Sequence, residues 1–178
     1  MLNKVIKPVL ATIDAISVNT GKLFSWLILA LVGIIVIEVF RRYALNAPIM
    51  GVQDATCAYF GAYYTMAGAY TLWAAGHVRV DVLWALAPPR GRAIMDSITF
   101  PFFVIFLVGM IYTGWQFGMM ATYITGVGWN LEVDQSHMRL PLYPAKWTIF
   151  IGSVLLLFQG VAKFVRDLKF GFTGKELG

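Results

Sequence analysis

Two long stretches without a charged side chain constrain this sequence more than any other feature. Residues 55–76 and 97–131 contain no Asp, Glu, Lys or Arg. Between them lies the polar segment Gly76-His77-Val78-Arg79-Val80-Asp81, which must reach water because charged groups are costly inside a bilayer. The pattern predicts a hairpin of two membrane-spanning helices joined by a charged elbow.

The composition places the chain among membrane proteins. Of its 178 residues, 59% are hydrophobic and only 13% are charged, a balance too apolar for a soluble domain of this length. Several spans of about 20 residues each would use up the sequence. We therefore predict a single membrane domain over residues 1–178. The one cysteine, Cys57, falls in an apolar run and is expected to be a small buried residue.

The predicted fold class is all-α, with four tilted transmembrane helices at about residues 23–43, 52–75, 98–123 and 147–165. The first span is too long for the apolar part of a signal peptide, and it ends in Glu38, Arg41 and Arg42 instead of a small-residue cleavage site. It should therefore remain as an anchor. Glu38 lies roughly 22 Å along the helix from Leu23, near the far end of the hydrocarbon, where either arginine can pair with it.

The N-terminal segment, at about residues 2–20, precedes these spans. Its apolar residues recur every three or four positions, which places them on one helical stripe opposite Asp14: Leu2, Val5, Val9, Ile13 and Ile16. This pattern predicts an amphipathic interfacial helix in the headgroup plane. Packing of the same stripe against a partner helix is the alternative.

The second and third spans carry recognisable packing signals. In the second, Ala58, Ala62, Thr65 and Ala69 form a small-residue stripe that predicts close approach to another helix. A separate bulky stripe is expected to face lipid or a partner subunit: Tyr59, Tyr63, Met66, Tyr70 and Trp73. In the third, Gly114 and Gly118 form a GxxxG pair, and Gln116 is expected to bond across a helix interface.

The distribution of basic residues predicts the topology. With four spans, both termini share one side with the elbow, and that side holds ten of the 14 Lys and Arg residues. The other side holds four, namely Arg41, Arg42, Arg139 and Lys146. The positive-inside rule then places both termini and the elbow in the cytoplasm. Orientation alone accounts for the net charge of +5, and no basic cluster with interleaved aromatics suggests nucleic-acid binding.

The same topology argues against an enzyme. The only histidines, His77 and His137, are expected on opposite membrane sides, so they could not share a metal or haem. There is no phosphate-binding glycine loop, CxxC pair or HExxH motif. We therefore expect no catalytic, metal or cofactor site in this chain. The predicted midplane also lacks the ionisable groups of a self-sufficient transporter.

Several short motifs together resemble one family. They are Glu38-Val-Phe-Arg-Arg-Tyr43, Asn46-Ala-Pro48, the acidic position Asp54, His77-Val-Arg-Val-Asp81 and Pro88-Pro89-Arg90. This sequence resembles the small membrane subunit (DctQ-like) of tripartite ATP-independent periplasmic (TRAP) transporters. The resemblance covers essentially the whole chain. It departs from the usual pattern at Gly51-Val52-Gln53, where many members have a Trp, and at Trp73-Ala-Ala-Gly76, which lacks a basic residue.

The resemblance implies a non-catalytic partner in a sodium-coupled uptake system of the bacterial inner membrane. A large multi-span subunit would hold the sodium and substrate sites, and a periplasmic substrate-binding protein would deliver the solute. This chain would act as a scaffold for the large subunit and contain no cofactor. Its expected interface or structural residues are Glu38, Arg41, Arg42 and Asp54 at the outer rim, with His77, Arg79 and Asp81 at the elbow.

The predicted outer loop at residues 125–144 is too long for a simple helix hairpin. It carries Trp129, Glu132, Asp134 and Arg139, a mixture suited to docking the binding protein, although it could instead pack on the large subunit. Two other classes remain open at this point. A stand-alone four-helix exporter would use Glu38 as its proton-titrating carboxylate, and a membrane-embedded enzyme or cytochrome subunit would need a bound cofactor.

Overall fold

A computed structural model of the chain describes residues 2–74, 76, 86, 88–124, 128, 129, 131–133 and 139–173. Its long helices are α1 (Leu2–Ala44), α2 (Val52–Trp73), α4 (Pro89–Thr122) and α5 (Tyr143–Thr173). The strands β1 (Tyr123–Ile124) and β2 (Gly128–Trp129) form a short antiparallel pair after α4, with Tyr123 opposite Trp129. The prediction of an all-α protein is confirmed in outline, and the strand pair is an addition to it.

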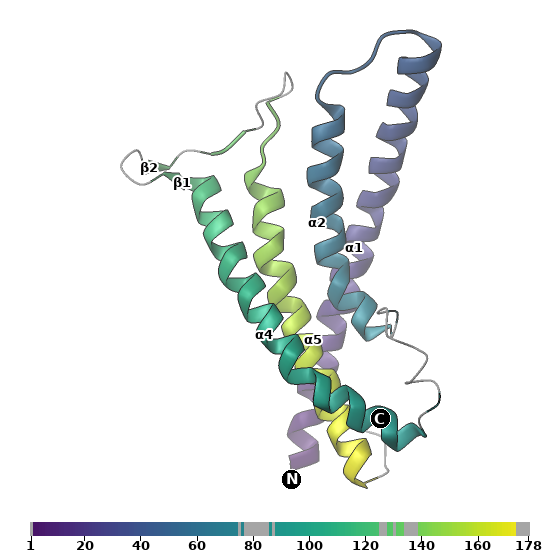
Figure 1. Cartoon of the computed structure of the whole chain (residues 1–178), viewed down its shortest axis with the longest axis vertical. Coiled ribbons are helices and arrows are strands. Elements are labelled where there is room, and N and C mark those ends of the chain that lie inside the picture. The colour runs from purple at the N-terminus through teal and green to yellow at the C-terminus, as the bar shows by residue number, and fades with distance from the viewer. Residues whose placement is uncertain are drawn as a thin grey trace.

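The long helices run alternately up and down along the chain, and side by side they lie in the order α4, α5, α2, α1 (Figure 1). The neighbours α5 and α2 therefore run in the same direction. Helix α5 packs extensively on both α4 and α2, α2 packs on α1, and α1 meets α5 over a smaller region. The start of α1 and the end of α5 lie at the same end of the molecule, where the pairs α1–α2 and α4–α5 converge (Figure 1). The arrangement is closer to a single curved layer of helices than to a closed bundle.

Helix α1 is one continuous element of 43 residues, so the structure does not contain a separate N-terminal helix at residues 2–20. Pro8 lies inside it. At 1.5 Å per residue α1 is about 64 Å long, roughly twice the thickness of a bilayer's hydrocarbon. The predicted apolar stripe does not pack against the other helices of this chain, because two of its members, Val9 and Ile16, are exposed.

The buried side of α1 is instead a narrow seam with alternating steps of four and three residues. Its members are buried or half-buried: Leu10, Asp14, Ser17, Gly21, Phe24, Ile28, Leu31, Ile35 and Glu38. Such spacing keeps one side of a helix against its neighbours over many turns. The seam passes without a break through the predicted boundary near residue 20, which explains why the two predicted helices form one.

Within the described residues, three helices are long and apolar enough to cross a membrane: α1 over Lys7–Ala44, α4 over Ile94–Thr122 and α5 over Tyr143–Gly171. Helix α2 covers almost the predicted second span but is not among the three. Helix α4 begins before the predicted third span, and Pro101 lies within it. Helix α5 extends beyond the predicted fourth span at both ends.

The small-residue signals proved informative about packing. A methyl group added at Gly114 would come within 2.9 Å of the Phe150 backbone nitrogen, and one at Gly152 within 2.7 Å of the Thr65 carbonyl oxygen. These close approaches join α5 to α4 and to α2. The small stripe of α2 is buried at Ala62 and Ala69, as predicted.

Three other packing expectations were wrong. Met66, placed on the bulky stripe thought to face outward, is buried, and Tyr70 covers Gly21 of α1. Gln116 is exposed on α4 instead of lying at an interface within this chain, and Cys57 is exposed on α2. Each error has one cause: helical spacing predicts which residues share a face but does not say which face meets a neighbour.

The Gly114 contact gives a test of the α4–α5 packing. Gly114→Ala should lower the stability of the detergent-purified chain by about 1–3 kcal/mol, because the backbone of Phe150 would have to move. Gly109→Ala is the matched control on the same helix, since an added methyl there meets nothing within 4 Å. Thermal unfolding of both variants measures the difference, and equal stability would contradict this packing.

Candidate functional site

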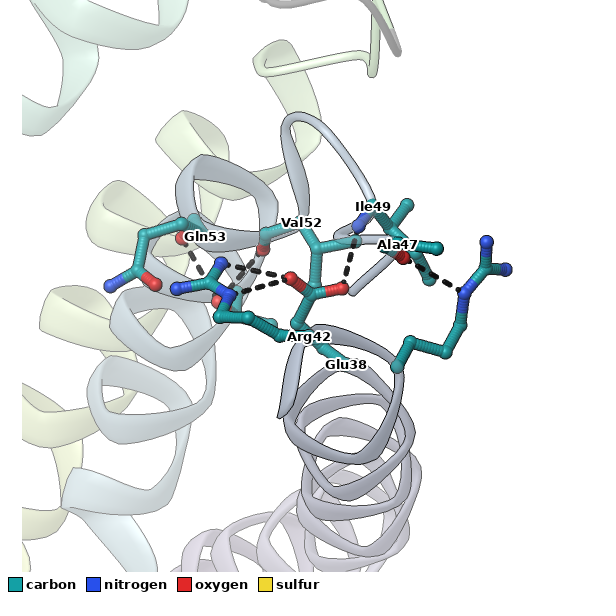
Figure 2. A network of polar contacts seen from close by, with 8 residues as sticks. Glu38, Arg42, Ala47, Ile49, Val52 and Gln53 are labelled. Carbon is teal, nitrogen blue, oxygen red and sulfur yellow. Dashed lines mark hydrogen bonds and ion pairs between the residues drawn. The ribbon is translucent and has the colours of Figure 1, made fainter. Parts of the chain in front are cut away.

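The first polar cluster lies where α1 ends and the chain turns back into α2 (Figure 2). Glu38 is buried, and its Oε1 accepts hydrogen bonds from Arg42 Nη2 at 2.8 Å and Nε at 3.2 Å. Its Oε2 accepts a hydrogen bond from the backbone N–H of Ile49 at 2.9 Å. Both carboxylate oxygens are therefore engaged within this chain, as expected of a charge held near a membrane surface.

The turn itself explains how Ile49 reaches Glu38. The backbone N–H groups of Leu45 and Ala47 both donate to the carbonyl of Arg41. Asn46 has a φ of 49° and Gly51 one of 86°, a left-handed conformation that these two residue types tolerate best. The sequence 46–51 thus folds the chain back over the end of α1 and directs one amide onto the buried carboxylate.

The other predicted rim charges are placed differently. Arg41 donates from Nε to the carbonyl oxygen of Ala47 at 3.3 Å and is exposed. Asp54 is exposed in the first turn of α2. Of the four outer-rim residues, the structure brings Glu38 and Arg42 into direct contact and leaves Arg41 and Asp54 on the surface.

The elbow residues His77, Arg79 and Asp81 lie outside the described residues, and so does Asp134 of the outer loop. What is described at the elbow is its beginning. The N–H of Gly76 donates to the carbonyl of Thr71 at 2.8 Å and that of Ala74 to Tyr70 at 2.9 Å, and these bonds close the end of α2.

Three of the four predicted docking residues of the outer loop are described, and one of them is paired while two are exposed. Glu132 forms an ion pair with Lys146 of α5, and its backbone bonds to Ala121 and Leu142 tie the loop to both α4 and α5. Trp129 is 82% exposed, although its ring meets Tyr123 edge-on at 5.8 Å. Arg139 is exposed and has a φ of 44°.

A second polar cluster, which the sequence analysis missed, joins α1 to α5 at the other end of the molecule. Ser17 Oγ donates to Gln159 Oε1 at 2.8 Å, and Gln159 Nε2 donates to Asp14 Oδ1 at 2.9 Å. Arg166 then pairs with both carboxylate oxygens of Asp14. Ser17 and Gln159 are each only 1% exposed, so this network satisfies polar groups that would be costly to bury alone.

An ion-pair bridge extends this end of the molecule to α4. Lys163 of α5 lies between Asp96 of α4 and Asp167 of its own helix, and contacts both carboxylates. The sequence contained a signal for these contacts. Asp14 and Ser17 share a face of one helix, and Gln159, Lys163 and Arg166 share a face of another, at spacings of three, four or seven residues.

Both clusters fix helix positions and offer no open reactive centre. Each carboxylate named in them already has a cationic partner. Among the described residues, no group of three His, Cys, Asp or Glu side chains is placed to hold a metal ion. The geometry is that of a layer of long helices held together near both of its ends.

A family model described as "Tripartite ATP-independent periplasmic transporters, DctQ component" matches residues 31–170, which is most of the chain. The chain belongs to the DctQ family. Searches of curated proteins and of solved structures gave no match. The predicted resemblance is thus confirmed, and the family is one of transporter components, not of enzymes.

The two polar clusters are covered differently by the DctQ family match. Glu38, Arg42 and the outer loop all lie within residues 31–170. Asp14 and Ser17 precede that range, whereas their partners Gln159 and Arg166 lie inside it. The stand-alone exporter that would titrate Glu38 finds no support, since the family is a TRAP component and the carboxylate is bound by Arg42 and Ile49.

The structural role of Glu38 can be tested by an isosteric change. Glu38→Gln removes the negative charge beside Arg42 and should lower the melting temperature of the purified chain by several degrees, because charge-assisted hydrogen bonds are the stronger kind. Arg41→Gln is the control, since Arg41 is exposed and the hydrogen bond described for its side chain goes to the backbone carbonyl of Ala47, not to Glu38. Equal melting temperatures for Glu38→Gln and the wild type would contradict this role.

The second cluster predicts that the same substitution at two glutamines has different effects on the free energy of unfolding. Gln159→Leu should cost about 1–3 kcal/mol of unfolding free energy, because it leaves the buried Ser17 hydroxyl without its acceptor and removes one of the donors to Asp14. Gln116→Leu makes the same change at an exposed position of α4 and should cost little. Chemical denaturation in detergent compares the two, and the opposite ranking would refute the assignment.

Proposed function

We propose that this DctQ protein is the non-catalytic small membrane subunit of a sodium-coupled TRAP uptake transporter in the bacterial inner membrane. TRAP transporters combine such a component with a large membrane subunit and a substrate-binding protein. In this proposal the large subunit holds the sodium and substrate sites. The DctQ chain stabilises it as a scaffold and helps to dock the binding protein.

The observation that carries the scaffold role is how little of the apolar surface this chain covers by itself. Only 11% of the most apolar 18-residue segment of α1 is buried, and only 6% of the corresponding segment of α4. Because the helices form one layer, their broad faces remain available to lipid and to another membrane subunit (Figure 1). A family that works within a multi-subunit transporter supplies a natural partner for part of this surface.

The contacts between α1 and α2 support a fourth span. At one end, Ile49, just before α2, bonds to Glu38, and at the other end Tyr70 covers Gly21. The two helices therefore run antiparallel over the same depth, from Gly21 to Glu38 on α1. If α1 crosses the membrane, α2 crosses beside it, and the lower hydropathy of α2 reflects its small and polar residues.

Four spans would place both termini on one side, in agreement with the shared end of α1 and α5 (Figure 1). The cations at that end include Lys7, Lys22, Arg92, Lys163, Arg166 and Lys169, and those at the other end include Arg41, Arg42, Arg139 and Lys146. The positive-inside rule favours cytoplasmic termini. The Glu38 cluster and the strand pair then face the periplasm, where the binding protein acts.

The docking proposal rests on the exposed loop residues Trp129 and Arg139, since Glu132 is already paired with Lys146. An exposed Trp and Arg are the residue types that most often dominate protein interfaces. His77, Arg79, Asp81 and Asp134 keep their proposed partner-contact roles from the sequence.

The decisive experiment for the function is co-purification. A tagged copy of this chain, co-expressed with the large TRAP subunit of the same organism, should retain that subunit through detergent extraction and size-exclusion chromatography. Failure to capture any large membrane subunit would overturn the proposal.

Docking is tested with the assembled complex. The double change Trp129→Ala and Arg139→Glu should weaken retention of the purified binding protein on vesicles containing both membrane subunits by about tenfold or more, and should leave assembly of the two membrane subunits intact. Tyr43→Ala, which alters another exposed aromatic residue at the same end, is the control. Undiminished retention by the double variant would refute the docking role.

A further inference from the structure

The outward side of α2 differs from the exposed sides of the apolar parts of α1, α4 and α5 in the described residues. Its exposed residues before the final turn are Gln53, Asp54, Cys57, Gly61 and Tyr64, a set we call the α2 outer face. Apart from the tyrosine ring, the face offers no large apolar side chain to lipid. This composition also explains why α2, alone among the four long helices described, is not apolar enough to count as a span by hydropathy.

The exposed sides of the neighbouring helices look like surfaces for lipid. On α5 the exposed residues of the apolar part are Ile151, Phe158, Val161 and Leu168. On α1 they include Leu23, Trp26, Leu29, Val32, Val36 and Phe40. Lipid tails solvate such side chains well, so these faces need no protein partner. The α2 outer face lacks this match to hydrocarbon.

Tyr64 points to a partner most directly. It is 67% exposed and lies twelve residues after Val52, which is about 18 Å along the helix and well inside the hydrocarbon if α2 spans the membrane. Its ring stacks with Phe60 and meets Tyr63 edge-on, so contacts within α2 hold it in place. In the described part of the chain no group bonds to its hydroxyl, and an unpaired hydroxyl in hydrocarbon is costly.

Gly61 and Asp54 suggest the shape and charge of that partner. A methyl group added at Gly61 would meet nothing within 4 Å, so packing within this chain does not require a glycine there, whereas a closely approaching outside helix would. Asp54 is exposed in the first turn of α2, beside the Glu38 end of α1, and no ion pair is described for it among the described residues.

We propose that the α2 outer face is the surface on which a transmembrane helix of the large TRAP subunit packs. That helix approaches closely at Gly61, supplies a hydrogen-bonding group to the Tyr64 hydroxyl, and places a basic side chain near Asp54. The proposal rests on the proposed function, and it adds which helix of this chain meets the partner. The exposed sides of α1 and α5 are left to lipid.

The test compares three exposed glycines that are equivalent within this chain. Gly61, Gly33 of α1 and Gly109 of α4 each have open space where a side chain would begin, so changing each to Leu should leave the chain folded when purified alone. Gly61→Leu should reduce capture of the co-expressed large subunit by about tenfold or more. Gly33→Leu and Gly109→Leu should capture it within about twofold of wild type.

Undiminished capture by Gly61→Leu would overturn the proposal, and so would an equal loss with Gly33→Leu or Gly109→Leu. If the unmodified chain captures no large subunit, the proposed function itself fails and this inference falls with it. Melting curves of the three variants alone separate a docking defect from misfolding.

Photo-crosslinking provides a second measurement that does not depend on a packing defect. With p-benzoylphenylalanine in place of Tyr64, irradiation of membranes should yield a covalent product with the large subunit. The same residue in place of Phe158, which is exposed on α5, should yield no such product. Crosslinking from position 158 and none from position 64 would assign the interface to α5 instead.

Discussion

The close backbone contact of α5 with its two neighbours is the constraint on which the rest of this structure depends. Apolar helices gain nothing from merely leaving lipid for one another, so they associate through close packing and hydrogen bonds. Gly114 brings α4 against the backbone at Phe150, and Gly152 brings α5 against the backbone at Thr65 of α2. Helix α5 is thereby the central member, and α1 joins the layer mainly through α2.

Polar clusters then fix the positions of the helices along one another, because close packing alone would let the helices slide. Asp14 and Glu38 both lie on the buried seam of α1, separated by 24 positions or about 36 Å of helix, slightly more than the thickness of the hydrocarbon. One binds α5 through Gln159 and Arg166, and the other binds the turn into α2 through Ile49. A separation of this size lets both charges lie close to water on the two sides of a bilayer, where paired charges cost least.

A single layer of helices suits a subunit that extends another protein. A closed bundle would bury its apolar faces internally, whereas here the broad faces of α1 and α4 remain almost entirely open. Long aliphatic and aromatic surfaces suit lipid, whereas the small and polar surface of α2 suits a protein neighbour. In the proposed complex the DctQ chain therefore lies between the large subunit and the bilayer.

The sequence by itself determined the class of protein, the all-α fold, the approximate positions of α2, α4 and α5, and the family. Those conclusions follow from local properties: uncharged length, helical period and short motifs such as the one around Glu38. It also predicted that Glu38 pairs with an arginine of its own helix, because residues three or four positions apart are neighbours; the structure shows that this arginine is Arg42. The Gly114 contact was signalled by its spacing from Gly118.

Only the tertiary structure decided which residues on different helices meet. The pairing of Asp14 with Gln159 and Arg166 joins residues about 150 positions apart, and no local pattern specifies that partner. Tertiary packing likewise made α1 continuous, buried Met66, and left Gln116 and Cys57 on the surface. The physical reason is the same throughout: in a protein this apolar, nearly every helix face could meet either lipid or protein. The choice depends on how closely whole helices can approach one another.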